Sequence, residues 1–248
     1  MGLVFNATNA QTSLNTVKKV VPMPSLRNRI EHSKTLAAIL GGVANGYLSL
    51  CDKTTRWQIE GRDALTSALA QGPVMLVMWH ERSIMGAVHW PVGAGPLSSL
   101  YDASPIGRVS GALQRQRGLQ PIEMSDKTSN IAASRSVLRR FKDGVSIGMT
   151  GDGPLGPARQ MKSAPLEWAR AGQMPVFGYA FASTRSKQLD TWDNMHLPLP
   201  FGRGAIVFDQ FDAIITRRPD EGEAEAQAQA LATFLDGVTV RADGLVKV

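Results

Sequence analysis

The chain has 248 residues, of which 43% are hydrophobic and 19% are charged, a composition that is typical of a globular protein and argues against a disordered chain or a polytopic membrane protein. A single cysteine, Cys51, excludes an internal disulfide framework and an all-cysteine metal site, and favours a reducing compartment. The net charge of +6 favours an anionic partner, whether nucleic acid, an anionic membrane surface or a phosphorylated substrate.

The N-terminal part predicts a leader followed by one apolar helix. Residues 1–30 are polar, and residues 1–16 lack a basic start followed by an apolar run, so we expect a poorly ordered leader and no signal peptide. Basic residues then precede the apolar segment Leu36–Cys51, which as a helix would be about 24 Å long, shorter than a hydrocarbon core of about 30 Å. Three interpretations remain open: a packed helix, a helix in a membrane interface with the basic residues against anionic lipid, or a membrane-spanning helix.

From residue 55 onward, predicted strands and helices alternate. Strands are expected at 55–61, 73–80, 96–104, 145–150, 174–183 and 204–211. Helices are expected at 62–72, 108–117, 129–144, 163–171 and 222–235. This alternation predicts an α/β architecture, with residues 1–54 as an N-terminal extension and residues 55–248 as one α/β domain.

The buried strand at 73–80 ends in a polar cluster that begins with His80. Chemistry in α/β sheets gathers at the carboxyl ends of strands, and a histidine that titrates near neutrality can take a proton from an attacking hydroxyl. We therefore predict that His80 is a general base, and assign no role to His89. A zinc-protease motif would need histidine at position 84, which is Ile84, so no metal site is expected, and a serine-hydrolase elbow is absent as well.

A glycine-rich loop follows the strand at 145–150. Its segment Gly151–Gly156 has the G-x-G-x-x-G spacing of dinucleotide-binding loops. Pro154 and Pro157 interrupt the helix start that such a loop requires, and no Gly-Lys-Ser/Thr follows as a Walker loop would need. The pattern therefore indicates a loop of another kind.

This loop places Asp152 at the end of a strand and adds two cations, Arg159 and Lys162. Glycines such as Gly153 and Gly156 let backbone N–H groups approach an anion, and the cations would neutralise it. A rigid connector with solvated charges remains the alternative.

Three stretches together, residues 73–83, 134–183 and 192–208, resemble the bacterial domain-of-unknown-function branch of the lysophospholipid acyltransferase superfamily. The resemblance covers roughly residues 55–212. Its most specific element is the strand followed by Asp152-Gly153-Pro154 and Gly156-Pro157, and the next is the pair Trp79-His80.

The resemblance implies a glycerolphosphate acyltransferase-like fold, with a mixed, largely parallel sheet flanked by helices. It also implies an O-acyltransferase without a cofactor, which moves a fatty acyl chain from acyl carrier protein or acyl-CoA to a hydroxyl of a phosphorylated lipid acceptor, a lipid A precursor or a lysophospholipid. The implied location is the cytoplasmic face of the bacterial inner membrane, as a peripheral or monotopic protein. Nucleic acid is not an expected partner, because the arginines of residues 135–140 lie on a solvated helix face without interleaved aromatic residues.

By the same resemblance, His80 is the base and Asp152-Gly153 belong to the acceptor-binding loop. In the superfamily a carboxylate usually stands five residues after the histidine, but here that residue is Met85. The acid that orients the imidazole must then come from elsewhere, and we expect Asp152, Asp102 or Glu81, in that order.

Several further residues are expected to bind substrate, with the cations neutralising a phosphate of the acceptor: Arg82, Gly153, Gly156, Arg159 and Lys162. A second departure from the pattern lies at Ile106-Gly107, where only the glycine matches. The missing carboxylate at Met85 favours an alternative, a lipid- or phosphate-binding protein that keeps the scaffold without the catalysis.

Overall fold

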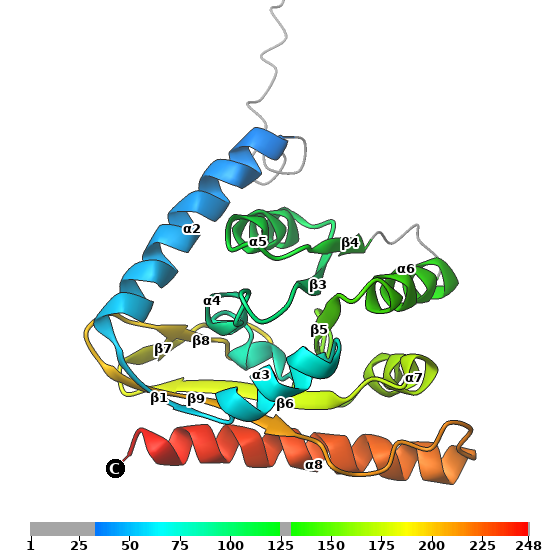
Figure 1. The fold of residues 1–248 in the computed structure, drawn as a ribbon. Coiled ribbons are helices and arrows are strands. Elements are labelled where there is room, and N and C mark those ends of the chain that lie inside the picture. The colour runs from blue at the N-terminus through cyan, green and yellow to red at the C-terminus, as the bar shows by residue number, and fades with distance from the viewer. Residues whose placement is uncertain (1–32, 125–129, 248) are drawn as a thin grey trace, which may run out of the picture.

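The structure, a computed structural model, describes residues 33–124 and 130–247, and confirms the α/β fold class with a mostly parallel mixed sheet flanked by helices (Figure 1). In the order in which they lie in the sheet, its seven strands are β1 (Arg56–Glu60), β9 (Arg203–Gln210), β6 (Val176–Ser183), β2 (Met75–Met78), β5 (Ser146–Thr150), β3 (Leu97–Asp102) and β4 (Ile122–Met124). Neighbouring strands are parallel except β6 and β9, which are antiparallel. A separate antiparallel pair is formed by β7 (Ser186–Gln188) and β8 (His196–Pro198).

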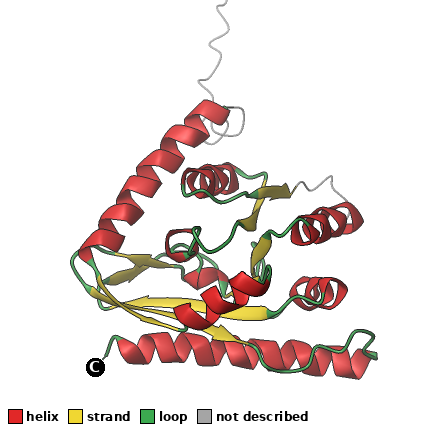
Figure 2. Cartoon of the chain, in the orientation of Figure 1, coloured by secondary structure: helices red, strands yellow, loops and turns green. Residues whose placement is uncertain are grey.

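Helices cover both faces of the sheet (Figure 2). One face carries α2 (Lys34–Thr54), α3 (Arg62–Gln71), α4 (Gly86–His89) and α5 (Pro105–Gln116). The other face carries α6 (Asn130–Lys142), α7 (Ser163–Gly172) and α8 (Glu221–Leu245). The predicted leader, including its basic residues, lies outside the described residues.

The central strand β2 contributes to the hydrophobic core on both faces. Leu76 and Met78 belong to the cluster under α2, α3 and α5, whereas Met75 and Val77 belong to the cluster under α6, α7 and α8. All four side chains are buried because successive residues of a strand point to opposite faces. The continuous apolar run in the sequence is therefore a strand buried on both sides.

Helix α2 packs against α5. At Gly41 an added Cβ would lie 2.9 Å from the Cβ of Ala112, so only glycine allows this close approach of the two helices. The side of α2 that faces away from the domain exposes three large apolar side chains, Ile39, Val43 and Leu50. Within the described ranges, no helix combines the length and the apolar character that a membrane span needs.

Two predicted helix boundaries were wrong. Helix α5 begins at Pro105, three residues before the expected start, because the Ser104 side chain caps it by accepting the Gly107 N–H at 3.0 Å. Helix α8 continues ten residues beyond the expected end at Leu235, because Val238 and Ala242 extend its buried face.

Candidate active site

His80 lies where β2 ends and a short 3₁₀ helix, η1 (His80–Arg82), begins. Strand β5 pairs with β2 in parallel, with Met78 opposite Thr150, so the loop after β5 leaves the sheet beside His80. The Gly151 N–H donates to the Met78 carbonyl at 2.8 Å. The structure therefore brings together His80 and the glycine-rich loop, as their predicted positions at the carboxyl ends of two strands had indicated.

Asp152 connects the two loops through its carboxylate. The side chain is 1% exposed; its Oδ1 accepts the His80 backbone N–H at 2.9 Å, and its Oδ2 accepts the Arg159 backbone N–H at 3.0 Å. Burial raises the pKa of this carboxyl, and the two backbone hydrogen bonds oppose that rise. Asp152 thus fixes the backbone at the site and does not orient the imidazole, which corrects the first expectation for the acid partner.

The acid partner of His80 is Asp193, a residue that sequence reasoning missed. Its Oδ2 lies 2.6 Å from the His80 Nδ1, and its Oδ1 accepts a hydrogen bond from the Thr191 hydroxyl at 2.7 Å. Asp193 is 2% exposed and lies between β7 and β8, 113 residues from His80 along the chain. One signal in the sequence could have indicated Asp193: it lies in residues 192–208, one of the three stretches that resemble the acyltransferase superfamily.

The other two expected acids are engaged elsewhere. The Asp102 carboxylate accepts the Ser104 backbone N–H at 2.9 Å, at the start of α5. The Glu81 carboxylate forms ion pairs with the side chains of Arg82 and Arg159. Both predictions of an acid partner were therefore wrong, because neighbouring donors satisfy these carboxylates.

The pairing of His80 with Asp193 sets the tautomer of the imidazole. An ionised carboxylate only accepts hydrogen bonds, so beside it the neutral imidazole carries its proton on Nδ1, and the free lone pair is on Nε2. The His80 side chain is 25% exposed. Beside it, the Trp192 ring lies 5.1 Å away between ring centroids and is itself 41% exposed. The arrangement is a basic nitrogen held in a fixed orientation at an accessible surface.

Arg82 does not face the site as a free cation. It is 3% exposed; its guanidinium pairs with Glu81 at 3.1 Å, donates to both Asp243 oxygens at 2.8 and 3.0 Å, and reaches the Phe181 carbonyl at 3.0 Å. This geometry opposes the predicted contact with a substrate phosphate, because the guanidinium is buried among acceptors from the protein itself. Arg82 joins η1 to β6 and α8.

Arg159 and Lys162 are both exposed, but only Arg159 is neutralised by carboxylates. The Arg159 guanidinium contacts Glu81 at 2.6 Å and Asp236 at 3.2 Å, and Asp236 also accepts the indole N–H of Trp79 at 3.0 Å. Of the three cations expected to bind a phosphate, Lys162 is the one for which the structure gives no carboxylate partner among the described residues.

The glycine-rich loop touches the segment that carries Asp193. Gly153 and Gly156 have φ angles of 69° and 70°, in the left-handed region that favours glycine. A Cβ at Gly156 would lie 2.5 Å from the Trp192 ring, so the absence of a side chain there lets the ring approach. Among the described residues, no group of three or more potential ligands gathers that could hold a metal ion.

Comparison with known proteins gives little functional information. No protein-family model matches the chain. An uncharacterized protein of Rickettsia prowazekii (strain Madrid E) is 25% identical over 186 residues, which cover 74% of this chain and 84% of that protein.

Proposed function

We propose that the protein is an O-acyltransferase in which His80 is the general base and Asp193 orients it. The observation that carries this proposal is the 2.6 Å contact between His80 Nδ1 and a buried carboxylate, at the carboxyl end of the central strand. The same arrangement of base and orienting acid activates hydroxyl groups on unrelated folds. The sequence resemblance to acyltransferases supports the choice of reaction.

The proposed reaction needs two proton transfers, one from the acceptor hydroxyl to His80 and one from His80 to the leaving thiolate. Nε2 of His80 removes the proton from an acceptor hydroxyl as its oxygen attacks the thioester carbonyl, and Asp193 stabilises the imidazolium that forms. Collapse of the tetrahedral intermediate breaks the C–S bond, and the leaving thiolate takes the proton from the imidazolium. An ester and a free thiol are the products, and no covalent acyl-enzyme is required because the thioester is already activated.

The proposed donor is acyl carrier protein or acyl-CoA, and the proposed acceptor is a phosphorylated lipid, a lipid A precursor or a lysophospholipid. The net charge of +6 suits an acidic carrier protein and an anionic membrane surface. The exposed apolar side of α2 supports peripheral attachment to a membrane surface, and the sequence resemblance supports the choice of the cytoplasmic face of the inner membrane.

The test is an assay of the full chain with acyl-carrier thioester and each acceptor lipid, which measures the free thiol and the acylated lipid. We expect His80→Ala to lower the rate by about 10²- to 10⁴-fold. His196→Gln is the matched control and should keep wild-type activity. Full activity of His80→Ala would disprove the mechanism.

The alternative is a binding protein without catalysis, and it was favoured because Met85 stands where the superfamily usually has a carboxylate. The structure supplies a carboxylate from Asp193 instead, so this support is weakened. The same assay separates the two functions, because a binding protein would hold the lipid without releasing thiol.

A further inference from the structure

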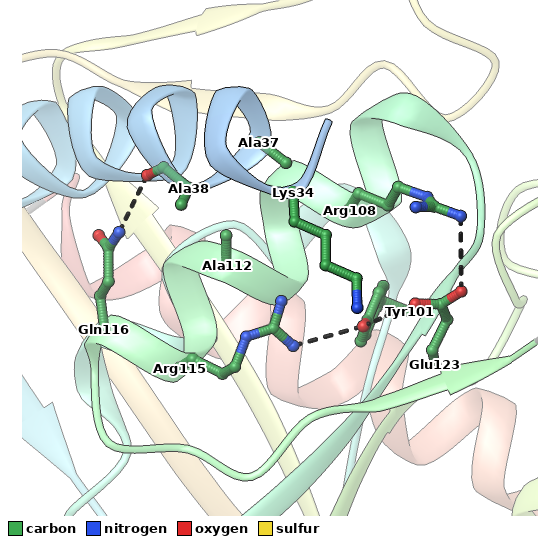
Figure 3. Close-up of a pocket in the computed structure, with 9 residues that line it drawn as sticks. All are labelled: Lys34, Ala37, Ala38, Tyr101, Arg108, Ala112, Arg115, Gln116 and Glu123. Carbon is green, nitrogen blue, oxygen red and sulfur yellow. Dashed lines mark hydrogen bonds and ion pairs between the residues drawn. The ribbon is translucent and has the colours of Figure 1, made fainter. Parts of the chain in front are cut away.

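A second candidate site lies between α2 and α5, above β3 and β4 (Figure 3). It is a cavity of about 520 Å³. The residues that line it come from these four elements: Lys34, Ala37, Ala38, Tyr101, Arg108, Ala112, Arg115, Gln116 and Glu123. This volume is in the range of small-molecule sites, and none of these residues contacts His80 or Asp193 through a hydrogen bond or an ion pair.

Cationic side chains in this cavity outnumber carboxylates. Lys34, Arg108 and Arg115 face the single carboxylate of Glu123. The arginine nitrogen nearest to the Glu123 carboxylate is Nη2 of Arg108. It lies 3.8 Å from Oε1, which is too far for a hydrogen bond. The cavity therefore keeps a surplus of positive charge, unlike the surroundings of His80, where carboxylates neutralise both Arg82 and Arg159.

Tyr101 holds these charges in position. Its hydroxyl donates to Glu123 at 3.1 Å and lies 3.3 Å from an Arg115 nitrogen, which donates to it, and the Arg115 guanidinium lies 5.6 Å from the Tyr101 ring centroid. A Cβ added at Gly111 would lie 2.8 Å from the ring, so the ring packs directly on the α5 backbone. Figure 3 shows the side chains of Lys34 and Arg115 directed toward Tyr101.

The remaining wall of the cavity is apolar. Ala37 and Ala38 of α2 face Ala112 of α5 across it, and Gln116 ties the two helices by donating to the Ala38 carbonyl at 3.1 Å. One ligand would thus meet positive charge at one side and small apolar side chains at the other.

We propose that this cavity binds a phosphate monoester through its phosphate, with the organic part of the ligand against the alanine wall. A dianionic phosphate matches the surplus of positive charge, and the guanidinium groups suit its oxygens. The cavity is larger than a bare phosphate requires, which leaves room for the organic group. The phosphate can belong to a free metabolite or to a lipid headgroup, and the proposal does not depend on acyl transfer.

The experiment measures ligand binding by the full chain. The soluble probes are inorganic phosphate, phenyl phosphate and succinate, studied by calorimetry. The lipid probe is phosphatidylcholine vesicles with and without phosphatidic acid, studied by co-sedimentation. The variants are Arg108→Gln combined with Arg115→Gln, which removes charge, and Ala38→Leu, which fills the cavity without a change of charge. Arg185→Gln removes an exposed cation elsewhere and is the matched control.

We expect phenyl phosphate to bind more tightly than inorganic phosphate, and the double variant to lose affinity by at least about tenfold. Ala38→Leu should weaken phenyl phosphate more than inorganic phosphate, and Arg185→Gln should change neither. Binding of vesicles with phosphatidic acid but not of phenyl phosphate, lost in the same variants, would support the proposal and identify a headgroup. The reverse pattern would support it and identify a free phosphate monoester.

Three results would overturn the proposal. The first is unchanged binding of every phosphate probe by both pocket variants, with unfolding curves that show them folded. The second is succinate binding as tight as that of phenyl phosphate. The third is loss of binding in His80→Ala, which should keep this site intact even though it stops acyl transfer; failure of the two proposals is therefore distinguishable.

Discussion

Two histidines nine residues apart lie in regions of opposite character. His80 follows the central strand, a quarter of its side chain is exposed, and its Nδ1 contacts the Asp193 carboxylate. His89 is the last residue of α4 and is only 4% exposed. Its Nδ1 lies 2.7 Å from the Tyr179 hydroxyl. Its Nε2 lies 3.7 Å from an Asp52 oxygen, beyond hydrogen-bond distance.

The difference shows what separates the proposed base from a core histidine. Burial lowers the pKa of His89 and so favours its neutral form, and the nearby Asp52 carboxylate offsets this only in part. His80 is instead partly exposed, and its Nδ1 lies 2.6 Å from a buried carboxylate oxygen of Asp193. Exposure and the type of partner, rather than the residue type, are therefore what favour His80 over His89 as the proposed base.

Asp193→Asn should have the largest effect at the His80 region. The amide removes the charge that stabilises the imidazolium and permits the wrong tautomer, so kcat should fall by about 10²- to 10⁴-fold. KM should change little, because Asp193 is 2% exposed and has little surface with which to contact an acceptor. Steady-state kinetics with the acyl thioester measures both quantities.

Asp190→Asn is the control for this prediction, since the exposed Asp190 lies three residues away in the same loop. It should keep wild-type kcat. Equal losses in the two variants would show that the loop, and not the Asp193 carboxylate, is what matters.

Asp152→Ala should act on stability as well as on the site. It leaves the His80 and Arg159 backbone N–H groups unpaired, and a buried unpaired donor costs about 1–3 kcal/mol. We expect the free energy of unfolding in urea to fall by about 2–4 kcal/mol. Asp152→Asn keeps one acceptor oxygen and should lose less; equal stability of all three proteins would contradict the role in holding the two loops.

The smallest expected effect concerns His89 and pH. A histidine whose folded pKa is lowered stabilises the fold above its unfolded pKa, near 6.5, and this contribution is lost as pH falls toward the folded pKa. Urea unfolding of the wild type should therefore show falling stability below about pH 6.5. His89→Gln should reduce that slope by up to about 1.4 kcal/mol per pH unit and keep acyl transfer.

His196→Gln provides the comparison for the pH experiment. Burial, and next the charge of Arg82, also lower the pKa of His196, but this side chain is only half-buried, so its share of the slope should be smaller. A larger effect at His196 than at His89 would break the distinction between the two histidine regions.

Much of the fold was predictable because strands that are buried on both faces of the sheet appear in the sequence as continuous apolar runs. The apolar runs at 73–80 and 145–150 became β2 and β5, and His80 followed the first of them. The order of strands was not readable from the residues, since nothing in the sequence states that β2 and β5 are neighbours. The three-residue strands β4, β7 and β8 are too short to show a period.

The site was predictable only in part, because ion pairing joins residues far apart in the chain. Asp193 has no spacing relation to His80, and it reaches His80 only because the loop between β7 and β8 lies beside the end of β2. Arg82 and Arg159 were expected to be free cations, but α8 brings Asp243 and Asp236, seven residues apart on one helix side, against them. Cation counts in a sequence therefore overstate the charge that a substrate meets.

The two residues of the His80–Asp193 pair should differ in how easily their surroundings open, because His80 follows the central strand β2 and Asp193 lies in a loop. Strand β2 is bonded on both sides in the middle of the sheet, so its amide hydrogens should exchange with solvent only when the whole molecule unfolds. Asp193 is held in a short loop whose neighbours Trp192 and Asn194 are exposed, where local opening is easier. Gentle warming should thus separate His80 from Asp193, and stop the proposed acyl transfer, while the rest of the domain is still folded.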